Sequence, residues 1–306
     1  MPSLDLTNSA TLDAFYTRMK KFRAAARASP IEQGHSFTLK LTYQASNAPN
    51  GHRRRHINPD LQALVSKSSR WYLQHALQSA PGQNAQVWLA TPNPDAETQS
   101  SQSAAHCIVL KIMQESFTDF PNPRWSPDDL GMYRTQEDRV STALSAYERL
   151  SDLQGSALPY FFGLTVTTAS WGEKLHILAF EYLPEPSLET VDHDRTEFVK
   201  WTDHKTYFTL AKSAVNALQA AHERNVLHTD LASRNIVIDS ANQQLVIIDW
   251  ERCEVDVRDR DDRAIREQRT LVGVLCRVVD GASPTGKAIG IWANGRIPGL
   301  NSYVSN

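Results

Sequence analysis

The chain has 306 residues, of which 41% are hydrophobic and 22% charged, as in an ordinary globular protein with a sizeable core. Its formal net charge is −2, whereas proteins that bind nucleic acid or an acidic membrane surface are typically strongly basic, so we expect neither partner. Three widely separated cysteines favour neither a disulfide framework nor a metal site, and they predict a reducing, cytoplasmic location. No apolar run is long enough to span a membrane, so we expect no membrane partner.

The first segment with a clear period is residues 12–28, where large apolar side chains recur at helical spacing. We expect a helix packed on the body of the protein, with its basic residues in solvent: Lys20, Lys21, Arg23 and Arg27. A helix lying on a membrane surface is the alternative. Residues 36–43 alternate apolar and polar side chains, which predicts a half-buried strand.

A turn-rich loop is predicted over residues 47–60, and it contains the basic run 52–56. We expect these charges to lie in solvent; contact with a phosphate or a partner is the alternative. Residues 61–78 have a mixed pattern that indicates a partly helical segment. Residues 81–89 begin with a turn and become a strand, and residues 91–105 form a polar insertion.

The next strand, residues 106–113, places Lys111 within an apolar run. A lysine there either extends its amine to solvent at an edge or has a buried anionic partner. Downstream we expect a proline-rich loop over 117–132, a strand over 175–182, and helices over 136–150, 203–224 and 264–279. Residues 281–306 predict no element.

The most informative stretch runs from residue 225 to 251. A hydrophobic run ends in His228-Thr-Asp230, Asn235 follows, and two short β-branched runs flank the polar turn 239–244 before Asp249. That pattern is typical of a β-hairpin, which would bring Asp249 back beside Asn235. An acid that serves as base and an Asn/Asp pair that holds Mg²⁺ are the groups that phosphoryl transfer to a hydroxyl requires.

The motif His228-x-Asp230-Leu-x-x-x-Asn235, followed by Ile-Asp249-Trp-Glu, resembles the catalytic core of the protein-kinase-like superfamily. Ile-Asp-Trp-Glu resembles the aminoglycoside and choline phosphotransferases, whereas Leu-Ala-Ser-Arg-Asn is closer to protein kinases and to fungal kinase-like proteins. The resemblance implies that Asp230 orients the acceptor hydroxyl and accepts its proton, that Asn235 and Asp249 bind Mg²⁺, and that His228 is structural.

The same resemblance implies an ATP site. Lys111 would contact the α- and β-phosphates, Gly82 would lie in the phosphate loop, and Val87 would lie beneath adenine. Backbone groups around Glu181 and Leu183 would hydrogen-bond the adenine ring. The usual three-glycine loop is absent, because Gly82 stands alone.

A helical glutamate normally orients the lysine in this superfamily, and Glu137 and Glu148 are both candidates. The implied fold is α+β and bilobal. It has an extension over 1–80, an N-lobe with a mainly antiparallel sheet over 81–183, and a short, mainly helical C-lobe over 184–306. The implied function is ATP-dependent phosphoryl transfer to a hydroxyl of a small molecule or protein. The alternative is a pseudokinase, a nucleotide-binding or empty scaffold without turnover.

Overall fold

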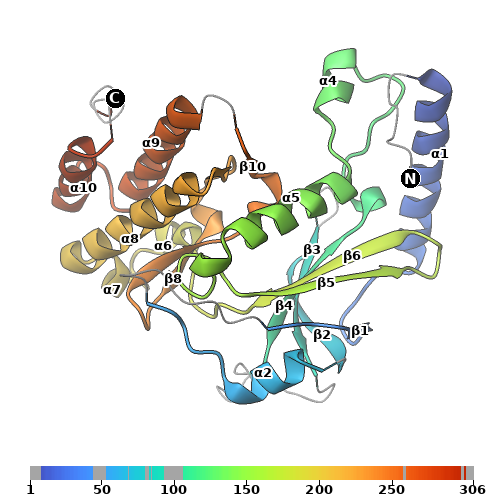
Figure 1. Cartoon of the computed structure of the whole chain (residues 1–306), viewed down its shortest axis with the longest axis horizontal. Helices are drawn as coiled ribbons and strands as arrows, with labels where there is room; N and C mark the ends of the chain where they lie inside the picture. Colours follow the sequence, from blue (N-terminus) through green and yellow to red (C-terminus); the bar gives the residue numbers. More distant parts are fainter. Residues whose placement is uncertain are drawn as a thin grey trace. The chain divides into compact units, whose positions relative to one another are not determined.

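The computed structural model describes residues 8–43, 53–67, 69–79, 83, 85–92, 106–257, 260–297 and 300. The chain is an α+β protein with a six-stranded antiparallel sheet and a set of helices, which confirms the predicted class (Figure 1). Its backbone divides into two compact units. Unit 1 consists of Met1–Gln44, Ile57–Val140 and Phe161–Tyr182, and unit 2 of Ala45–His56, Ser141–Tyr160 and Leu183–Asn306.

The sheet of unit 1 has the strand order β1-β2-β3-β4-β6-β5, and every neighbouring pair is antiparallel. Alternation along β4 buries Ile108, Leu110 and Ile112 and leaves Lys111 partly exposed between them. The strands are β1 (Ser36–Leu39), β2 (Ser69–Gln78), β3 (Gln86–Thr91), β4 (Ile108–Met113), β5 (Phe161–Thr168) and β6 (Lys174–Glu181). The first 80 residues therefore contribute two strands to the same sheet as β3–β6.

Helix α1 (Ser9–Ala28) begins where the Asn8 side chain accepts a hydrogen bond from the backbone N–H of Thr11. It buries three apolar residues of the predicted stripe, Leu12, Phe15 and Met19. The prediction that all its basic residues lie in solvent is wrong for Arg23. The Arg23 Nε donates to the carbonyl of Ser116 at 2.7 Å, and its guanidinium lies 4.2 Å from the ring centroid of Phe120.

The described part of unit 2 contains residues 141–149 of helix α5 (Gln136–Arg149) and the helices α6 (Leu188–His193), α7 (Val199–Thr202), α8 (His204–Glu223), α9 (Arg260–Val278) and α10 (Pro284–Asn294). Helices α8, α9 and α10 pack side by side (Figure 1), and α8 also packs on strand β9 (Gln244–Ile247). The helix predicted over 203–224 is confirmed, with Asp203 as its N-cap. Its buried side carries Tyr207, Leu210, Ala214 and Leu218. The helices predicted over 136–150 and 264–279 are also confirmed, as α5 (Gln136–Arg149) and α9.

Three helices occupy segments where the sequence pattern predicted a loop, a mixed segment or nothing: α2 (Pro59–Val65), α4 (Pro127–Met132) and α10. Each starts with proline at the first helical position, behind a capping Asn58, Ser126 or Ser283. Proline suits that position because its missing N–H has no helical partner there. The polar insertion predicted over 91–105 lies outside the described residues from residue 93 onward. Among the described residues, no helix is both long and apolar enough to cross a bilayer.

Candidate active site on the 225–251 segment

The predicted hairpin is present in unit 2, formed by β8 (Ile236–Asp239) and β9 (Gln244–Ile247), with Ile236 opposite Ile247. Beyond the last pair, the backbone N–H of Ile248 donates to the carbonyl of Asn235 at 2.9 Å. This bond joins the residue before Asp249 to Asn235. Asp249 is therefore the residue after this bond, and its contact with Asn235 through a shared metal stays a prediction.

The loop between β7 (Val226–Leu227) and β8 is held by the fully buried ring of His228. Its Nδ1 accepts the backbone N–H of Asp230 at 3.3 Å, and its Nε2 lies 2.8 Å from the carbonyl of Ile248. Because a carbonyl only accepts, Nε2 is the protonated nitrogen of a neutral imidazole. Both nitrogens are thus engaged by the backbone, so His228 connects the loop to the hairpin and has no free nitrogen for chemistry.

Asn235 completes the loop, since its Nδ2 donates to the backbone carbonyl of Asp230 at 2.9 Å. The amide oxygen of Asn235 then remains as a neutral ligand atom. Four non-glycine residues of the 225–251 segment have left-handed backbones: Asn225, Thr229, Gln243 and Asp249, with φ of 58°, 60°, 53° and 69°. Such conformations cost roughly 1–2 kcal/mol each and occur where the surrounding contacts fix them, often at functional sites.

Two arginines flank the carboxylate of Asp230, whose side chain is 21% exposed. The Arg234 Nη2 donates to both of its oxygens, at 3.2 and 3.4 Å, and the Arg252 Nη1 lies 3.8 Å from one of them. Both guanidinium groups are about half exposed. The site therefore combines an accessible carboxylate with positive charge suited to a phosphate or another anion.

Glu267 on α9 supports the loop from beneath, and the sequence pattern did not identify it. Its carboxylate accepts the backbone N–H groups of His228 at 3.2 Å and Thr229 at 2.5 Å, and it contacts His222 Nε2 on α8 at 2.6 Å. Burial raises the pKa of Glu267, but the hydrogen bonds from His222 and Thr229 outweigh burial and hold this pKa below its ordinary value. A single ionised side chain thus ties α8, α9 and the loop together.

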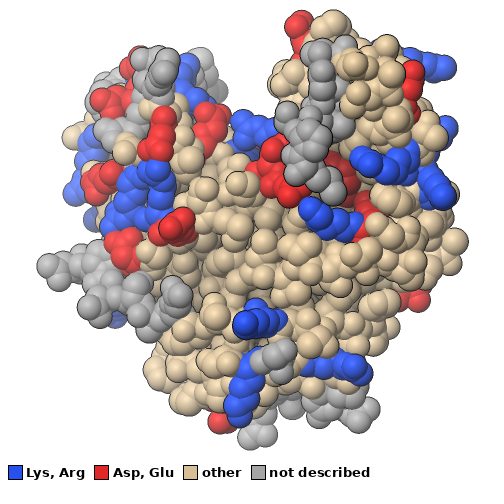
Figure 2. Space-filling model, turned by 45° about the vertical axis from the view of Figure 1, so that its right-hand side comes forward, with Lys and Arg blue, Asp and Glu red and all other residues tan. Residues whose placement is uncertain are grey.

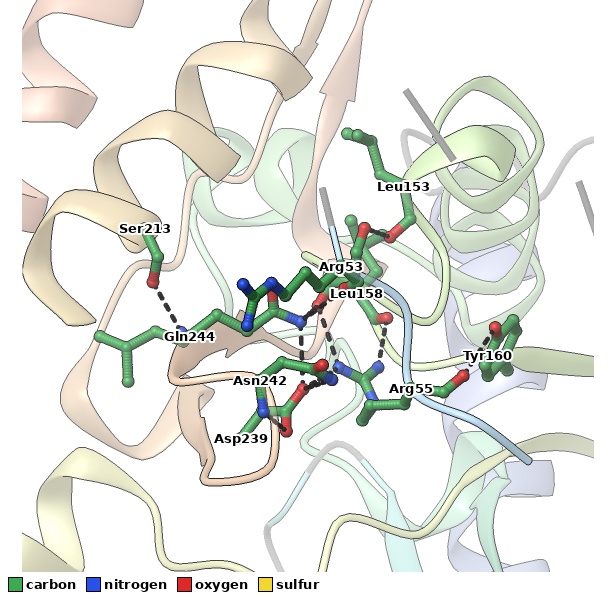
Figure 3. A network of polar contacts seen from close by, with 11 residues as sticks. Arg53, Arg55, Leu153, Leu158, Tyr160, Ser213, Asp239, Asn242 and Gln244 are labelled. Atoms are coloured by element: carbon green, nitrogen blue, oxygen red, sulfur yellow. Dashed lines mark hydrogen bonds and ion pairs between the residues drawn. The ribbon is translucent and has the colours of Figure 1, made fainter. Parts of the chain in front are cut away.

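In the basic run 52–56, Arg53 and His56 are exposed as predicted, but Arg55 is anchored in unit 2 beside the hairpin turn (Figure 3). Its Nη1 contacts a carboxylate oxygen of Asp239 at 3.2 Å and the carbonyl of Ser156 at 3.0 Å, and its Nη2 donates to the carbonyl of Leu158 at 2.7 Å. The Arg55 and Asp239 side chains are 10% and 3% exposed.

Neighbouring groups complete this network. Gln244 Nε2 donates to Asp239, and the Tyr160 hydroxyl donates to the backbone carbonyl of Arg55 (Figure 3). Gly155 accepts the backbone N–H of Arg55 and has φ of 76°. A Cβ there would overlap the ring of Tyr160, so only glycine fits. The network holds the turn of the hairpin that carries Asn235 at one end.

The residues assigned to nucleotide binding are distributed along the chain. Lys111 on β4 lies opposite Val87 on β3 and Leu178 on β6, and Glu181 ends β6 in the same sheet of unit 1. Leu183 begins the last segment of unit 2. Gly82 lies outside the described residues. The assignment of these residues to ATP stays a prediction.

The two glutamates considered as partners of Lys111 are exposed on helix α5. The Glu137 carboxylate lies 3.4 Å from Lys174 Nζ on β6. Either assignment to Lys111 stays a prediction.

Comparison of the chain with known protein families gave no match, and comparison with curated proteins gave none either.

Substituting Arg55 tests whether the network stabilises unit 2. Arg55→Ala leaves the buried Asp239 carboxylate without its ion-pair partner, so we expect a loss of about 3–5 kcal/mol in the free energy of unfolding. The matched control is Arg149→Ala, which breaks an exposed pair with Asp256 in the same unit and should cost at most about 1 kcal/mol. Urea unfolding followed by tryptophan fluorescence measures both. Equal small losses would contradict the assignment.

The lowered pKa of Glu267 predicts that the free energy of unfolding depends on pH. Because its folded pKa lies below the unfolded value of 4.5, its contribution is present above about pH 4.5 and is lost as the pH falls through the folded pKa. Glu267→Gln should therefore lower the free energy of unfolding at pH 6 by about 1.5–3 kcal/mol and reduce the further loss between pH 6 and pH 4. The exposed Glu223→Gln serves as control and should leave the wild-type pH profile unchanged.

Proposed function

We propose that the chain is an ATP-dependent phosphotransferase with a bilobal protein-kinase-like fold. It transfers the γ-phosphoryl group to a hydroxyl of a small molecule or a protein, in the cytoplasm. One observation carries the proposal. The proposed base, Asp230, and the proposed metal ligands, Asn235 and Asp249, belong to one loop and hairpin. Two hydrogen bonds join these parts: Asn235 Nδ2 donates to the carbonyl of Asp230, and the N–H of Ile248 donates to the carbonyl of Asn235.

In the proposed reaction Asp230 acts as the base. The acceptor oxygen forms a bond to the γ-phosphorus, the bond from that phosphorus to the β–γ bridging oxygen breaks, and ADP leaves with that oxygen. The proton of the hydroxyl passes to the Asp230 carboxylate. Accessibility of this side chain supports the role, since an acceptor must reach it from solvent.

Asn235 and Asp249 are the residues that would hold Mg²⁺, which when bound neutralises the charge of the phosphates. Magnesium bound with a nucleotide takes one or two oxygen ligands from the protein and the rest from phosphate and water. The chemistry of the pair fits, because the engaged amide nitrogen of Asn235 leaves its oxygen as the ligand atom. Asp249 has a left-handed backbone conformation, which changes the direction of the chain shortly after β9.

The supporting groups have distinct proposed tasks. His228 and Glu267 fix the loop, and Arg234 and Arg252 supply positive charge beside Asp230. Lys111 keeps the role that the resemblance implies, contact with the α- and β-phosphates of ATP. These tasks are positioning and charge neutralisation, which account for most of the catalysis in phosphoryl transfer.

The base assignment predicts activity that depends on Asp230. Purified protein with Mg²⁺-ATP should transfer labelled phosphate to an acceptor among pooled metabolites or generic protein substrates. Asp230→Asn should lower the rate by about 10²–10⁴-fold, because the amide cannot accept the proton. The exposed Asp262→Asn is the control and should retain the wild-type rate. Nucleotide binding without turnover, equal in wild type and Asp230→Asn, would instead support a pseudokinase.

The metal assignment predicts a nucleotide-dependent thermal shift. ATP with Mg²⁺ should raise the melting temperature, equivalent to about 2.7 kcal/mol at a ligand concentration one hundred times Kd. The shift should disappear when EDTA replaces Mg²⁺ and in Asp249→Ala, whereas Asp262→Ala should keep it. A shift that survives in Asp249→Ala would contradict the proposed ligand set.

A further inference from the structure

A groove of about 1030 Å³ lies within unit 1, and its lining residues include Glu137, one of the two candidate partners of Lys111. It is bounded by α1, the 3₁₀ turn Glu115–Phe117, the start of α5 and the start of β6. Figure 2 shows acidic side chains gathered on one face of the molecule, with Lys and Arg side chains beside them. Phe15, Met19 and Phe22 line one side of the groove.

Two carboxylates of the groove accept hydrogen bonds from neutral donors; Glu173 is buried and Glu115 is half-buried. Glu173 is 2% exposed and accepts only neutral donors: the N–H of Ser116 at 2.7 Å, the Ser116 hydroxyl at 2.6 Å and the Trp171 indole N–H at 2.9 Å. Glu115 accepts the Tyr133 hydroxyl and the N–H of Gln136. Neither carboxylate forms an ion pair within the part of the chain that the structure describes. A buried carboxylate normally has such a partner, because burying an unpaired charge is costly.

The two acids also act on each other. Burial raises the pKa of Glu115, hydrogen bonds from Tyr133 and Gln136 lower it, the neighbouring Glu173 carboxylate raises it, and the charge of Arg139 lowers it. A positive charge between the two acids would offset both effects that raise this pKa. The basic residues that line the groove do not supply it: Lys174 pairs with Glu137, and the Arg18 guanidinium lies 5.6 Å from the ring centroid of Phe15.

His176 on β6 provides an independent sign of a ligand. Its ring lines the groove and is 6% exposed, and neither ring nitrogen has a hydrogen-bond partner among the described residues. Burial lowers the pKa of His176, and the charge of Lys174 adds to this, so the ring is neutral near pH 7. A neutral imidazole has one nitrogen that accepts a hydrogen bond. The groove therefore offers an unused acceptor beside two carboxylates.

We propose that this groove binds a small organic cation, a guanidinium or ammonium group on a short aliphatic chain. Glu115, Glu173 and His176 would receive its N–H donors in charge-assisted hydrogen bonds, and the wall of Phe15, Met19 and Phe22 would pack on its carbon chain. A metal ion is the less suitable occupant, since the described residues include no group of three His, Cys, Asp or Glu placed to hold one. The volume suits a small molecule.

Matched probes separate charge from shape. Calorimetric titration with n-butylguanidine and n-butylamine should detect binding, and the neutral isosteres n-butylurea and n-butanol should bind at least about tenfold more weakly, a difference of about 1.4 kcal/mol. Glu173→Gln and Glu115→Gln should each weaken binding of n-butylguanidine by about tenfold or more. The matched control is Glu137→Gln, an acid of the same groove whose charge is already paired with Lys174 and whose loss should change Kd by less than about threefold.

Equal binding of the charged and neutral probes, or the same affinity in Glu173→Gln and Glu115→Gln as in wild type, would overturn the proposal. If these variants fail to fold, hydrogen exchange of the wild-type protein decides. n-Butylguanidine should slow exchange in residues 10–22, 115–117 and 133–138 and leave residues 225–251 unchanged. Protection confined elsewhere, or none at saturating probe, would overturn it. The result is independent of phosphotransferase activity.

Discussion

Asn235 joins the loop and the hairpin of the 225–251 segment through hydrogen bonds of its side chain and its main chain. Its side chain donates to the carbonyl of Asp230, and its own carbonyl accepts the N–H of Ile248. An unpaired backbone group in a buried place would cost a free energy comparable to a lost hydrogen bond. The position of Asp249 therefore follows from the requirement that loop and hairpin complete each other's hydrogen bonds. The proposed chemistry depends on that constraint, because it needs Asp230 and Asp249 on opposite sides of one asparagine.

Several parts of the fold could be predicted from the sequence because they depend on local periodicity. The helical period of 203–224 and the two β-branched runs around 239–244 each specify an element without reference to the rest of the chain. Strand β2 also has a local signal, since buried Trp71 and Leu73 alternate with more exposed neighbours. The mixed composition of 61–78 hid it, because the helix α2 and the strand share that window.

Other parts could not be predicted, because they depend on contacts between residues far apart in sequence. Nothing near Arg55 indicates that its partner is Asp239, and nothing on α9 indicates that Glu267 receives the N–H groups of residues 228 and 229. A basic run is usually solvated, so the local pattern favoured the wrong environment for Arg55. The loop and hairpin that carry the proposed reacting residues could therefore be predicted from local spacing, whereas the groups that support them could not.

Three buried carboxylates, Asp239, Glu267 and Glu173, differ in the groups that contact them. Asp239 is compensated by Arg55, and Glu267 is compensated by His222 and two backbone N–H groups, so each of these acids fixes a piece of unit 2. Glu173 is equally buried but has neutral donors alone. The desolvation cost of a carboxylate is similar in the three places, but Arg55 and His222 contact Asp239 and Glu267 directly, whereas the charge of Arg23 acts on Glu173 without such a contact. A buried acid of this kind, which lines the same groove as His176, is a place where a cation from solution gains the ion pair that the described chain does not form.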